Sequence, residues 1–309
     1  MKLLVTKVFR ETHSGRLAAI APSVELVDLS ADLDPTVLDL AFFSPDCYPE
    51  RAPEFMSALL GTSKMRWMHT FSAGVDHPIF TALTDKGIRL TTSSGAAADP
   101  IAQAVVMYLL ALARQLPQTM RNQMEREWVQ LDGRDLSGTT TVVLGFGPIG
   151  RAVANLLPVF GSKVIALRRA ALGDESCEIW ALSRLHEALS IADQLVLALP
   201  ANADTIGMLD KAALECLPES ALVVNVGRGE LIDEGALVDA LEQERIAGAA
   251  LDVFVEEPLP EASPLWDLPN VIITPHMSAR TPATNAAAVE IFFDNLARFV
   301  EDSPLLNEV

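Results

Sequence analysis

Cysteine is scarce in this chain, and its scarcity limits the chemistry that the chain can support. The three cysteines, Cys47, Cys177 and Cys216, are odd in number and lack the spacing of metal ligands. We therefore expect no bound metal ion and no disulfide framework. Unpaired thiols are typical of a reducing compartment, so the expected location is the cytoplasm.

Basic residues are also few. Lys and Arg number 23 against 41 Asp and Glu, which gives a formal net charge of −18. Such a charge repels nucleic acid and anionic membranes, and neither is expected as a partner. The longest apolar helix candidate, residues 101–113, is short for a membrane span and lies between Asp99 and Arg114. Charges at Lys7 and Arg10 indicate that the chain starts with a strand rather than a signal peptide.

What the chain does have is a regular alternation of apolar strands with helices. Hydrophobic residues make up 50% of its 309 residues, enough for two separate cores. Strands are predicted at residues 3–8, 24–26, 38–43, 66–70, 140–144, 163–167, 194–199, 221–226, 247–253 and 271–274. Residues 91–95 are expected to form a loop, and the tail after Ser303 is expected to be loosely held.

The alternation predicts the fold class and the domains. Strands that alternate with helices form parallel sheets, so we expect an α/β protein with two Rossmann-like or flavodoxin-like doubly wound domains and a cleft between them. The expected substrate domain is discontinuous and combines residues 1–98 with 282–309. The expected dinucleotide-binding domain spans residues 99–281.

A glycine-rich turn follows the predicted strand at residues 140–144 and opens a helix. Gly145, Gly147 and Gly150 form the pattern G-x-G-x-x-G, and Pro148 and Ile149 lie inside it. The pattern is typical of a turn that brings the pyrophosphate of a dinucleotide to a helix N-terminus. Glycine turns also join strands to helices that bind nothing, but the strand, turn, helix and second strand found together favour a cofactor site.

The end of the next strand indicates which cofactor binds. A protein that binds NAD usually has an acidic residue about 20 positions after the first glycine, and an Arg there accommodates a 2′-phosphate. This chain has Arg168 and Arg169 at that point, and the nearest acids beyond the strand, Asp174 and Glu175, come too late. We therefore expect NADP(H) to be preferred over NAD(H). The alternative is that both arginines are merely solvated.

Three ionisable residues follow the last strands of the second half. Arg228 stands between two glycines, Glu257 follows the next strand, and His276 follows the last one. An arginine binds a carboxylate through its planar fork, a histidine exchanges a proton at neutral pH, and a glutamate orients that histidine. The alternatives are an ion pair of Arg228 with a nearby acid and a histidine that is simply packed.

Several segments together resemble the NAD(P)-dependent D-2-hydroxyacid dehydrogenases. They are residues 71–76 (FSAGVD), 145–150 (GFGPIG), 225–229 (NVGRG), 250–260 (ALDVFVEEPLP), 263–266 (SPLW) and 274–276 (TPH). The resemblance implies an oxidoreductase that reduces small 2-oxo acids, such as glyoxylate or hydroxypyruvate, to D-2-hydroxy acids. It implies that Arg228 binds the substrate, His276 donates the proton and Glu257 orients His276.

The resemblance also implies further contacts. The substrate carboxylate is expected on the backbone of Ala73, Gly74 and Val75, with Phe43, Ser44, Cys47 and Ser72 in the pocket wall. Expected cofactor contacts, besides the glycine turn, are Arg168, Arg169, Pro200, Thr205, Val226, Gly227, Asp252 and Ser278. A homodimer is expected, with residues 101–113 and the segment around Trp128 at its interface.

Two departures and two alternatives remain. Gln103 stands where the family usually has Glu, and residues 277–280 replace a common glycine-rich run. The same fold could act on another anion, such as phosphite or phosphoglycerate, which would require cations near the substrate loops; Arg66 is the candidate there. The chain could also be a nucleotide-sensing binding protein like the corepressors that share this fold.

Overall fold

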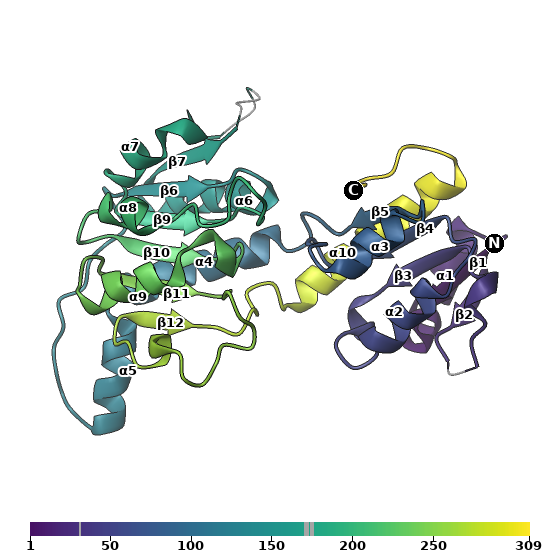
Figure 1. Ribbon diagram of the computed structural model, residues 1–309, viewed down its shortest axis with the longest axis horizontal. Helices are drawn as coiled ribbons and strands as arrows, with labels where there is room; N and C mark the ends of the chain where they lie inside the picture. The colour runs from purple at the N-terminus through teal and green to yellow at the C-terminus, as the bar shows by residue number, and fades with distance from the viewer. Residues whose placement is uncertain (31, 170–172, 174–175) are drawn as a thin grey trace. The chain divides into compact units, whose positions relative to one another are not determined.

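The computed structural model describes residues 1–30, 32–169, 173 and 176–309 (Figure 1). The chain divides into two compact units. Unit 1 comprises Met1–Ala97 with Thr281–Val309, and unit 2 comprises Ala98–Arg280. Among the described residues, no helix combines the length and apolar character needed to cross a membrane.

Unit 1 is built on a five-stranded sheet in the order β2-β1-β3-β4-β5, with every neighbouring pair parallel. The strands are β1 (Lys2–Val5), β2 (Glu25–Asp28), β3 (Leu40–Phe43), β4 (Trp67–Thr70) and β5 (Arg89–Thr92). The helices are α1 (Lys7–Ile20), α2 (Ala52–Leu60), α3 (Pro78–Thr84) and α10 (Pro282–Val300). Successive residues of β3 are buried in different cores, because Leu40 packs with Phe292 of α10 and Ala41 packs with Phe55 of α2.

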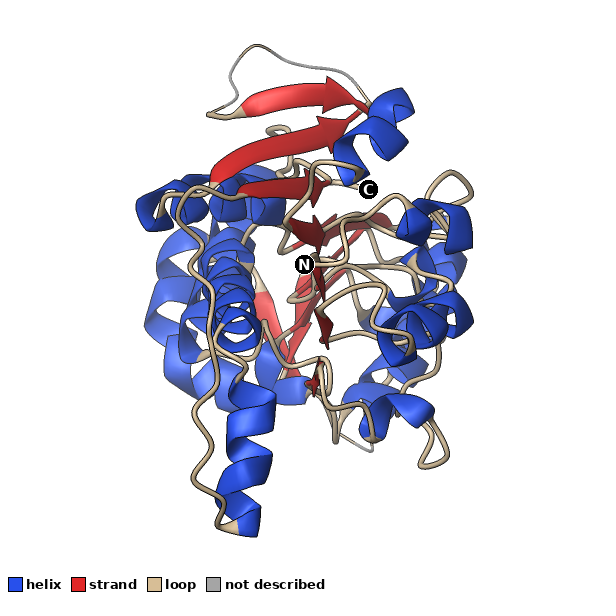
Figure 2. Ribbon diagram, turned by 90° about the vertical axis from the view of Figure 1, so that its left-hand side faces the viewer, coloured by secondary structure: helices blue, strands red, loops and turns tan. Residues whose placement is uncertain are grey.

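Unit 2 is built on a seven-stranded parallel sheet in the order β12-β11-β10-β9-β6-β7-β8. The strands are β6 (Thr140–Leu144), β7 (Lys163–Arg168), β8 (Glu178–Ala181), β9 (Gln194–Leu197), β10 (Leu222–Asn225), β11 (Gly248–Leu251) and β12 (Val271–Ile273). The helices are α4 (Ala98–Ala113), α5 (Leu116–Glu125), α6 (Pro148–Leu156), α7 (Leu185–Leu189), α8 (Lys211–Glu215) and α9 (Glu234–Glu242). Helices flank both faces of this sheet (Figure 2).

The expected α/β fold class is confirmed in both units. In unit 2 the strand order reverses between β6 and β9, since β7 lies on one side of β6 and β9 on the other. Ligands of such sheets bind beyond the carboxyl ends of the strands at this reversal. The glycine turn follows β6, so it lies where the topology favours a dinucleotide.

Two predicted boundaries in unit 1 were wrong. The first strand ends at Val5, because the Thr6 side chain accepts the N–H of Phe9 at 3.1 Å and starts helix α1. Thr91 and Thr92 belong to β5 rather than to a loop. Their β-branched side chains are buried, which favours a strand over the turn that their polarity suggested.

The prediction of a loose tail after Ser303 was also wrong. The buried carboxamide of Asn295 on α10 accepts the N–H of Leu306 at 2.7 Å and donates to its carbonyl at 3.1 Å. The next residues pair antiparallel with β5, where Val309 N–H donates to Leu90 at 2.9 Å. The tail therefore covers the edge strand of the sheet in unit 1.

Candidate functional site

The glycine turn after β6 has the shape that a dinucleotide requires. Gly145 has a φ of +99°, and a Cβ there would lie 2.8 Å from the carbonyl oxygen of Ala198. A Cβ on Gly150 would lie 2.0 Å from the carbonyl oxygen of Gly145, so the helix packs tightly on the turn. No heavy atom of the described chain lies within 4 Å of the Cβ position at Gly147. The turn thus leaves open space at the residue that an approaching pyrophosphate would meet.

Helix α6 presents its N-terminus to this open space. Gly147 is the N-cap and makes no side-chain cap hydrogen bond, and Pro148 is the first helical residue. Free N–H groups and the positive end of the helix dipole favour a phosphate at that point. Arg168 ends the neighbouring strand β7 and is partly buried, and Arg169 next to it is exposed. Asp174 and Glu175 lie outside the described residues.

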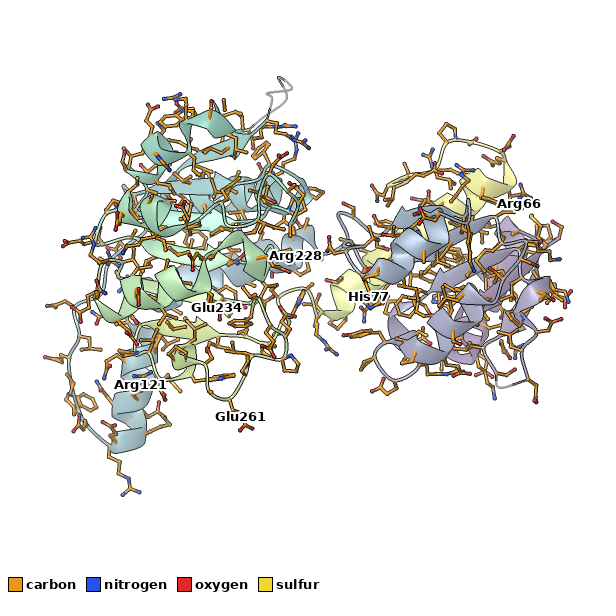
Figure 3. The ribbon with its side chains drawn as sticks, viewed as in Figure 1. Arg66, His77, Arg121, Arg228, Glu234 and Glu261 are labelled. Atoms are coloured by element: carbon orange, nitrogen blue, oxygen red, sulfur yellow. The ribbon has the colours of Figure 1, made fainter. Side chains whose placement is uncertain are left out.

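Arg228 lies in a tightly closed turn directly after β10, and Figure 3 labels it beyond the strands of unit 2. Asn225, which is buried, donates its Nδ2–H to the carbonyl of Arg228 at 2.8 Å and accepts the N–H of Gly227 at 3.0 Å. One guanidinium N–H of Arg228 donates to the carbonyl of Gly227 at 2.8 Å. The turn therefore fixes the backbone from which the arginine extends.

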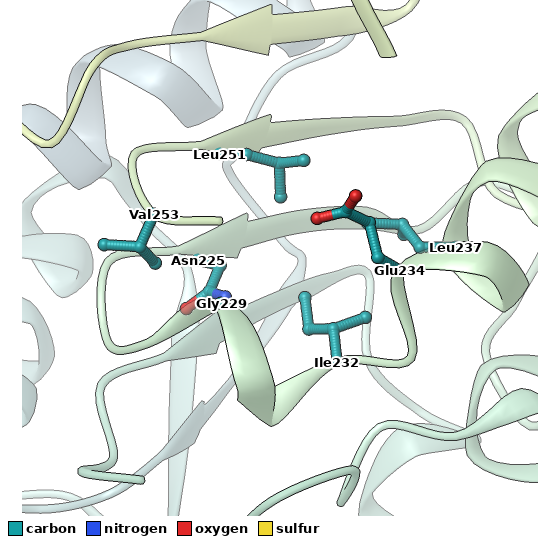
Figure 4. A pocket seen from close by; sticks show the side chains of 7 residues that line it. All are labelled: Asn225, Gly229, Ile232, Glu234, Leu237, Leu251 and Val253. Atoms are coloured by element: carbon teal, nitrogen blue, oxygen red, sulfur yellow. The ribbon is translucent and has the colours of Figure 1, made fainter. Parts of the chain in front are cut away.

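Gly229 brings the Arg228 turn against the loop that follows β11. A Cβ at this position would lie 1.9 Å from the carbonyl carbon of Phe254, so only glycine fits. Beside Gly229 is a small cavity of about 10 Å³, which at most one water molecule would fill (Figure 4). Its lining residues are Asn225, Gly229, Ile232, Glu234, Leu237, Leu251 and Val253.

His276 and Glu257 form a direct contact. The Nδ1 atom of His276 lies 2.8 Å from Oε2 of Glu257. The other carboxylate oxygen of Glu257 accepts the N–H of Phe254 at 3.0 Å, which fixes the carboxylate. An ionised carboxylate only accepts hydrogen bonds, so Nδ1 carries the proton and Nε2 is the ring nitrogen available to other groups. The His276 side chain is 52% exposed and therefore accessible.

The three residues reach one edge of the sheet from neighbouring strands. Arg228 follows β10, Glu257 follows β11 and His276 follows β12, and these strands are adjacent and parallel. A guanidinium, an oriented imidazole and a carboxylate together can bind an anion and transfer a proton. Among the described residues, no group of three or more His, Cys, Asp or Glu is placed to hold a metal ion.

Asp252, an expected cofactor contact, has both carboxylate oxygens hydrogen-bonded to other groups of the chain. It is 1% exposed and accepts hydrogen bonds from the Thr274 hydroxyl at 2.6 Å and from the N–H groups of Met277 at 2.9 Å and Ser278 at 3.0 Å. The hydroxyl of Ser278 donates to it as well. The carboxylate therefore organises the loop around His276, and its contact with a cofactor stays a prediction.

The other expected cofactor contacts lie in short loops at the same edge. The Thr205 hydroxyl donates to the carbonyl of Pro200 at 2.7 Å and accepts the N–H of Asn202 at 2.9 Å, so it closes the loop that follows β9. Val226 is 6% exposed and continues β10. Their direct contact with a cofactor also stays a prediction.

The expected substrate contacts of unit 1 follow β3 and β4. The Ser72 hydroxyl donates to the carbonyl of Gly74 at 3.0 Å and so shapes the loop that includes Ala73 and Val75. Phe43 is 5% exposed and packs against Phe55 and Phe71.

Ser44 and Cys47, which follow β3, are both fully buried within the chain. Burial raises the pKa of the Cys47 thiol to about 12, which keeps it protonated and unreactive. These side chains contribute to the packing of unit 1, and their role as a pocket wall stays a prediction.

The sequence alone did not point to one buried polar side chain of this region. Tyr108 on α4 is 2% exposed, and its hydroxyl lies 2.7 Å from Oγ1 of Thr274, which in turn donates to Asp252. A signal did exist, because a single Tyr within an apolar helix needs a partner for its hydroxyl when it is buried. Its partner, Thr274, directly follows β12 and is 166 positions further along the chain, so the contact is visible only in the fold.

Comparison with known proteins identifies a family with this fold. Residues 106–278 match the family model described as D-isomer specific 2-hydroxyacid dehydrogenase, NAD binding domain. Glyoxylate/hydroxypyruvate reductase B of Pectobacterium atrosepticum is 35% identical over 241 residues, which cover 75% of each chain. D-3-phosphoglycerate dehydrogenase of Mycobacterium tuberculosis is 33% identical over 232 residues, which cover 72% of this chain and 43% of that protein.

A solved structure with a similar fold comes from Sinorhizobium meliloti. It is an NADPH-dependent glyoxylate/hydroxypyruvate reductase in complex with NADP and sulfate. The two chains superpose with a TM-score of 0.81 at 28% identity, over 100% of this chain and 97% of the other.

Proposed function

The chain belongs to the D-isomer specific 2-hydroxyacid dehydrogenase family, and we propose that it uses NADPH to reduce small 2-oxo acids to D-2-hydroxy acids. The observation that carries the proposal is the 2.8 Å contact between His276 and Glu257. These two residues and Arg228 follow β12, β11 and β10, which lie side by side in that order in the sheet. Glyoxylate and hydroxypyruvate are the substrates we favour, because relatives named for them match most of the chain.

The residues have distinct tasks in this proposal. The guanidinium of Arg228 binds the substrate carboxylate through its planar fork. His276 holds a proton on Nε2 and gives it to the substrate carbonyl oxygen, while Glu257 stabilises the imidazolium through Nδ1. A nicotinamide cofactor, when bound, would supply the hydride for the reduction. The residues expected to hold that cofactor are the glycine turn and Arg168, with Arg168 beside the 2′-phosphate.

A phosphorylated substrate is less consistent with the residues of unit 1. The loops at residues 44–49 and 71–76 contain no Lys or Arg. Arg66, the candidate cation, precedes β4 and so lies at the amino end of that strand, where its guanidinium sits over the ring of Phe299 (Figure 3). The loops that follow β3 and β4 begin at the opposite ends of these strands.

The experiment that tests the proposal follows the oxidation of NADPH, and separately of NADH, with 2-oxo acids from glyoxylate to bulky ones. We expect turnover with NADPH well above that with NADH, and the highest activity with the small acids. A preference for NADH would show that Arg168 does not select the cofactor. If no 2-oxo acid supports turnover while the protein still binds NADPH, the chain is a nucleotide-sensing binding protein instead.

A further inference from the structure

A line of buried hydroxyl groups links helix α4 to the loop that carries His276. It runs from the hydroxyl of Tyr108 to Oγ1 of Thr274 at 2.7 Å, and from there to Oδ1 of Asp252 at 2.6 Å. Tyr108 is 2% exposed and Asp252 is 1% exposed, so water competes little for these groups. The proposed reaction gives Tyr108 and Thr274 no direct part, so their arrangement needs another reason.

The chemistry of the groups fixes the direction of the hydrogen bonds. The carboxylate of Asp252 receives backbone N–H groups, which only donate, so it acts as an acceptor throughout. Thr274 has one hydroxyl hydrogen and donates it to Asp252. Tyr108 must then be the donor to Thr274. Burial raises the pKa of Tyr108, which keeps its hydroxyl protonated and able to donate.

The end of this line is the backbone of His276 and of the two residues that follow it. The carboxylate of Asp252 accepts the N–H groups of Met277 and Ser278, and its backbone carbonyl accepts the N–H of His276 at 2.8 Å. His276 itself has a φ of +48°, in the left-handed region. That conformation is unfavourable for a residue with a side chain, so the surrounding hydrogen bonds must maintain it.

We propose that Tyr108 is a positioning residue, whose hydroxyl acts through Thr274 and Asp252 to hold the loop that aims His276. This inference rests on the proposed function, in which His276 donates the proton. Tyr108→Phe removes the hydroxyl and keeps the buried aromatic ring. Thr274→Val removes the hydroxyl that links Tyr108 to Asp252, and Thr274→Ser keeps that hydroxyl.

A matched control is Thr141→Val. Thr141 is a fully buried threonine of β6 whose hydroxyl lies 2.8 Å from Oγ of Ser162 and 3.0 Å from Oε1 of Gln194. These bonds do not involve the His276 loop. Thr141→Val therefore removes a buried hydroxyl from the same unit and is expected to lower the urea midpoint of unfolding, as Tyr108→Phe does, without moving His276.

Two measurements test the inference. In steady-state assays with NADPH and the preferred 2-oxo acid, we expect kcat to fall about 3- to 10-fold in Tyr108→Phe and about 10- to 30-fold in Thr274→Val, with both KM values within about twofold. Thr274→Ser should keep most of the wild-type kcat, and Thr141→Val all of it. In hydrogen exchange without substrate, the amides of residues 276–278 should exchange about 10-fold faster than in the wild type in Tyr108→Phe and in Thr274→Val. In Thr274→Ser and Thr141→Val these amides should exchange at the wild-type rate.

The two measurements separate this inference from the proposed function. If Tyr108→Phe and Thr274→Val lower stability but leave kcat and the exchange of residues 276–278 as in the wild type, the positioning role is overturned. If the wild type reduces no 2-oxo acid, the proposed function fails. The exchange rates of residues 276–278 then decide alone whether Tyr108 holds the loop through Thr274 and Asp252. Rates that are unchanged in Tyr108→Phe and Thr274→Val would overturn the inference.

Discussion

At the scale of single residues, His276 is where the site makes its sharpest prediction. Proton donation acts in the transition state, so His276→Ala should lower kcat by about 10²- to 10⁴-fold and leave the Kd of NADPH nearly unchanged. Steady-state kinetics and fluorescence titration with NADPH measure the two quantities. His186→Ala, which removes an exposed histidine of α7, is the control and should behave as the wild type. Near wild-type turnover in His276→Ala would remove His276 from the site.

A second histidine, His69 on β4, predicts how stability depends on pH. It is fully buried and hydrogen-bonded to the hydroxyls of Thr91 at 2.7 Å and Ser93 at 3.0 Å. Burial lowers its pKa to about 3, from 6.5 in the unfolded chain. The unfolded state therefore binds the proton first, so stability is intact above about pH 6.5 and falls as the pH drops toward 3. By linkage, the loss at pH 5 is about 2 kcal/mol.

Urea unfolding at pH 7.5 and pH 5 tests this expectation. His69→Asn should be less stable than the wild type at pH 7.5, because it loses hydrogen bonds and packing. The variant lacks the titrating group, so its difference from the wild type should shrink by about 2 kcal/mol at pH 5. If the difference in unfolding free energy between the variant and the wild type is the same at both pH values, His69 does not cause the loss of stability at low pH.

The placement of a site residue could be predicted from the sequence where the residue directly follows a predicted strand. Arg228, Glu257 and His276 each follow a predicted strand, and parallel strands bring such positions to one edge. The partners of Asp252 could not be predicted in the same way. Its carboxylate accepts from Thr274, Met277 and Ser278, which belong to another strand and loop, and nothing in the local sequence specifies these pairings.

At the scale of elements, the C-terminal tail predicts two substitution effects of different size. Asn295→Ala removes the two hydrogen bonds between the buried carboxamide and Leu306, so it should cost about 2–3 kcal/mol of unfolding free energy. Glu308→Gln weakens the ion pair with Arg89, whose atoms lie 2.6 Å apart but whose side chains are 39% and 36% exposed. Solvent screens such a pair, and the expected cost is below about 1 kcal/mol.

Urea midpoints and hydrogen exchange measure the difference between these variants. Asn295→Ala should also speed amide exchange at Val309 and Thr92, which bond the tail to β5. Equal losses in both variants would show that the tail is held by its charges rather than by the Asn295 carboxamide.

The elements themselves were predicted with uneven success, for physical reasons. Central strands such as β6 and β9 begin where the apolar pattern predicts, because each contains a run of three apolar residues that is buried on both faces of the sheet. The edge strand β8 (Glu178–Ala181) was missed, because it is only four residues long, with exposed residues at both ends and two half-buried residues between them. The order of the strands in each sheet depends on contacts far apart in the sequence, and the sequence pattern did not predict it.

At the scale of the whole molecule, one surface of unit 2 is unusual for a chain with a net charge of −18. Helix α5 and the extended segment after it project from the unit (Figures 1 and 2). They expose Met124 at 76% and Trp128 at 95%, beside a groove of about 480 Å³ lined by residues that include Trp128 and Val129. Helix α4, also expected at an interface, instead buries most of its apolar side chains within unit 2. Contiguous apolar exposure of this kind marks a surface that is covered by a partner.

We propose that a second copy of this chain covers the surface formed by α5 and residues 126–130. Light scattering at micromolar concentration should then give twice the chain mass of 33.3 kDa. Trp128→Glu should shift the protein to monomer, because it places a charge at an apolar side chain that is 95% exposed. Val159→Glu, at a residue of another surface that is 79% exposed, should leave the mass unchanged. A wild-type protein that is monomeric at this concentration would contradict the proposal, since an unpaired apolar arm would then be stable in water.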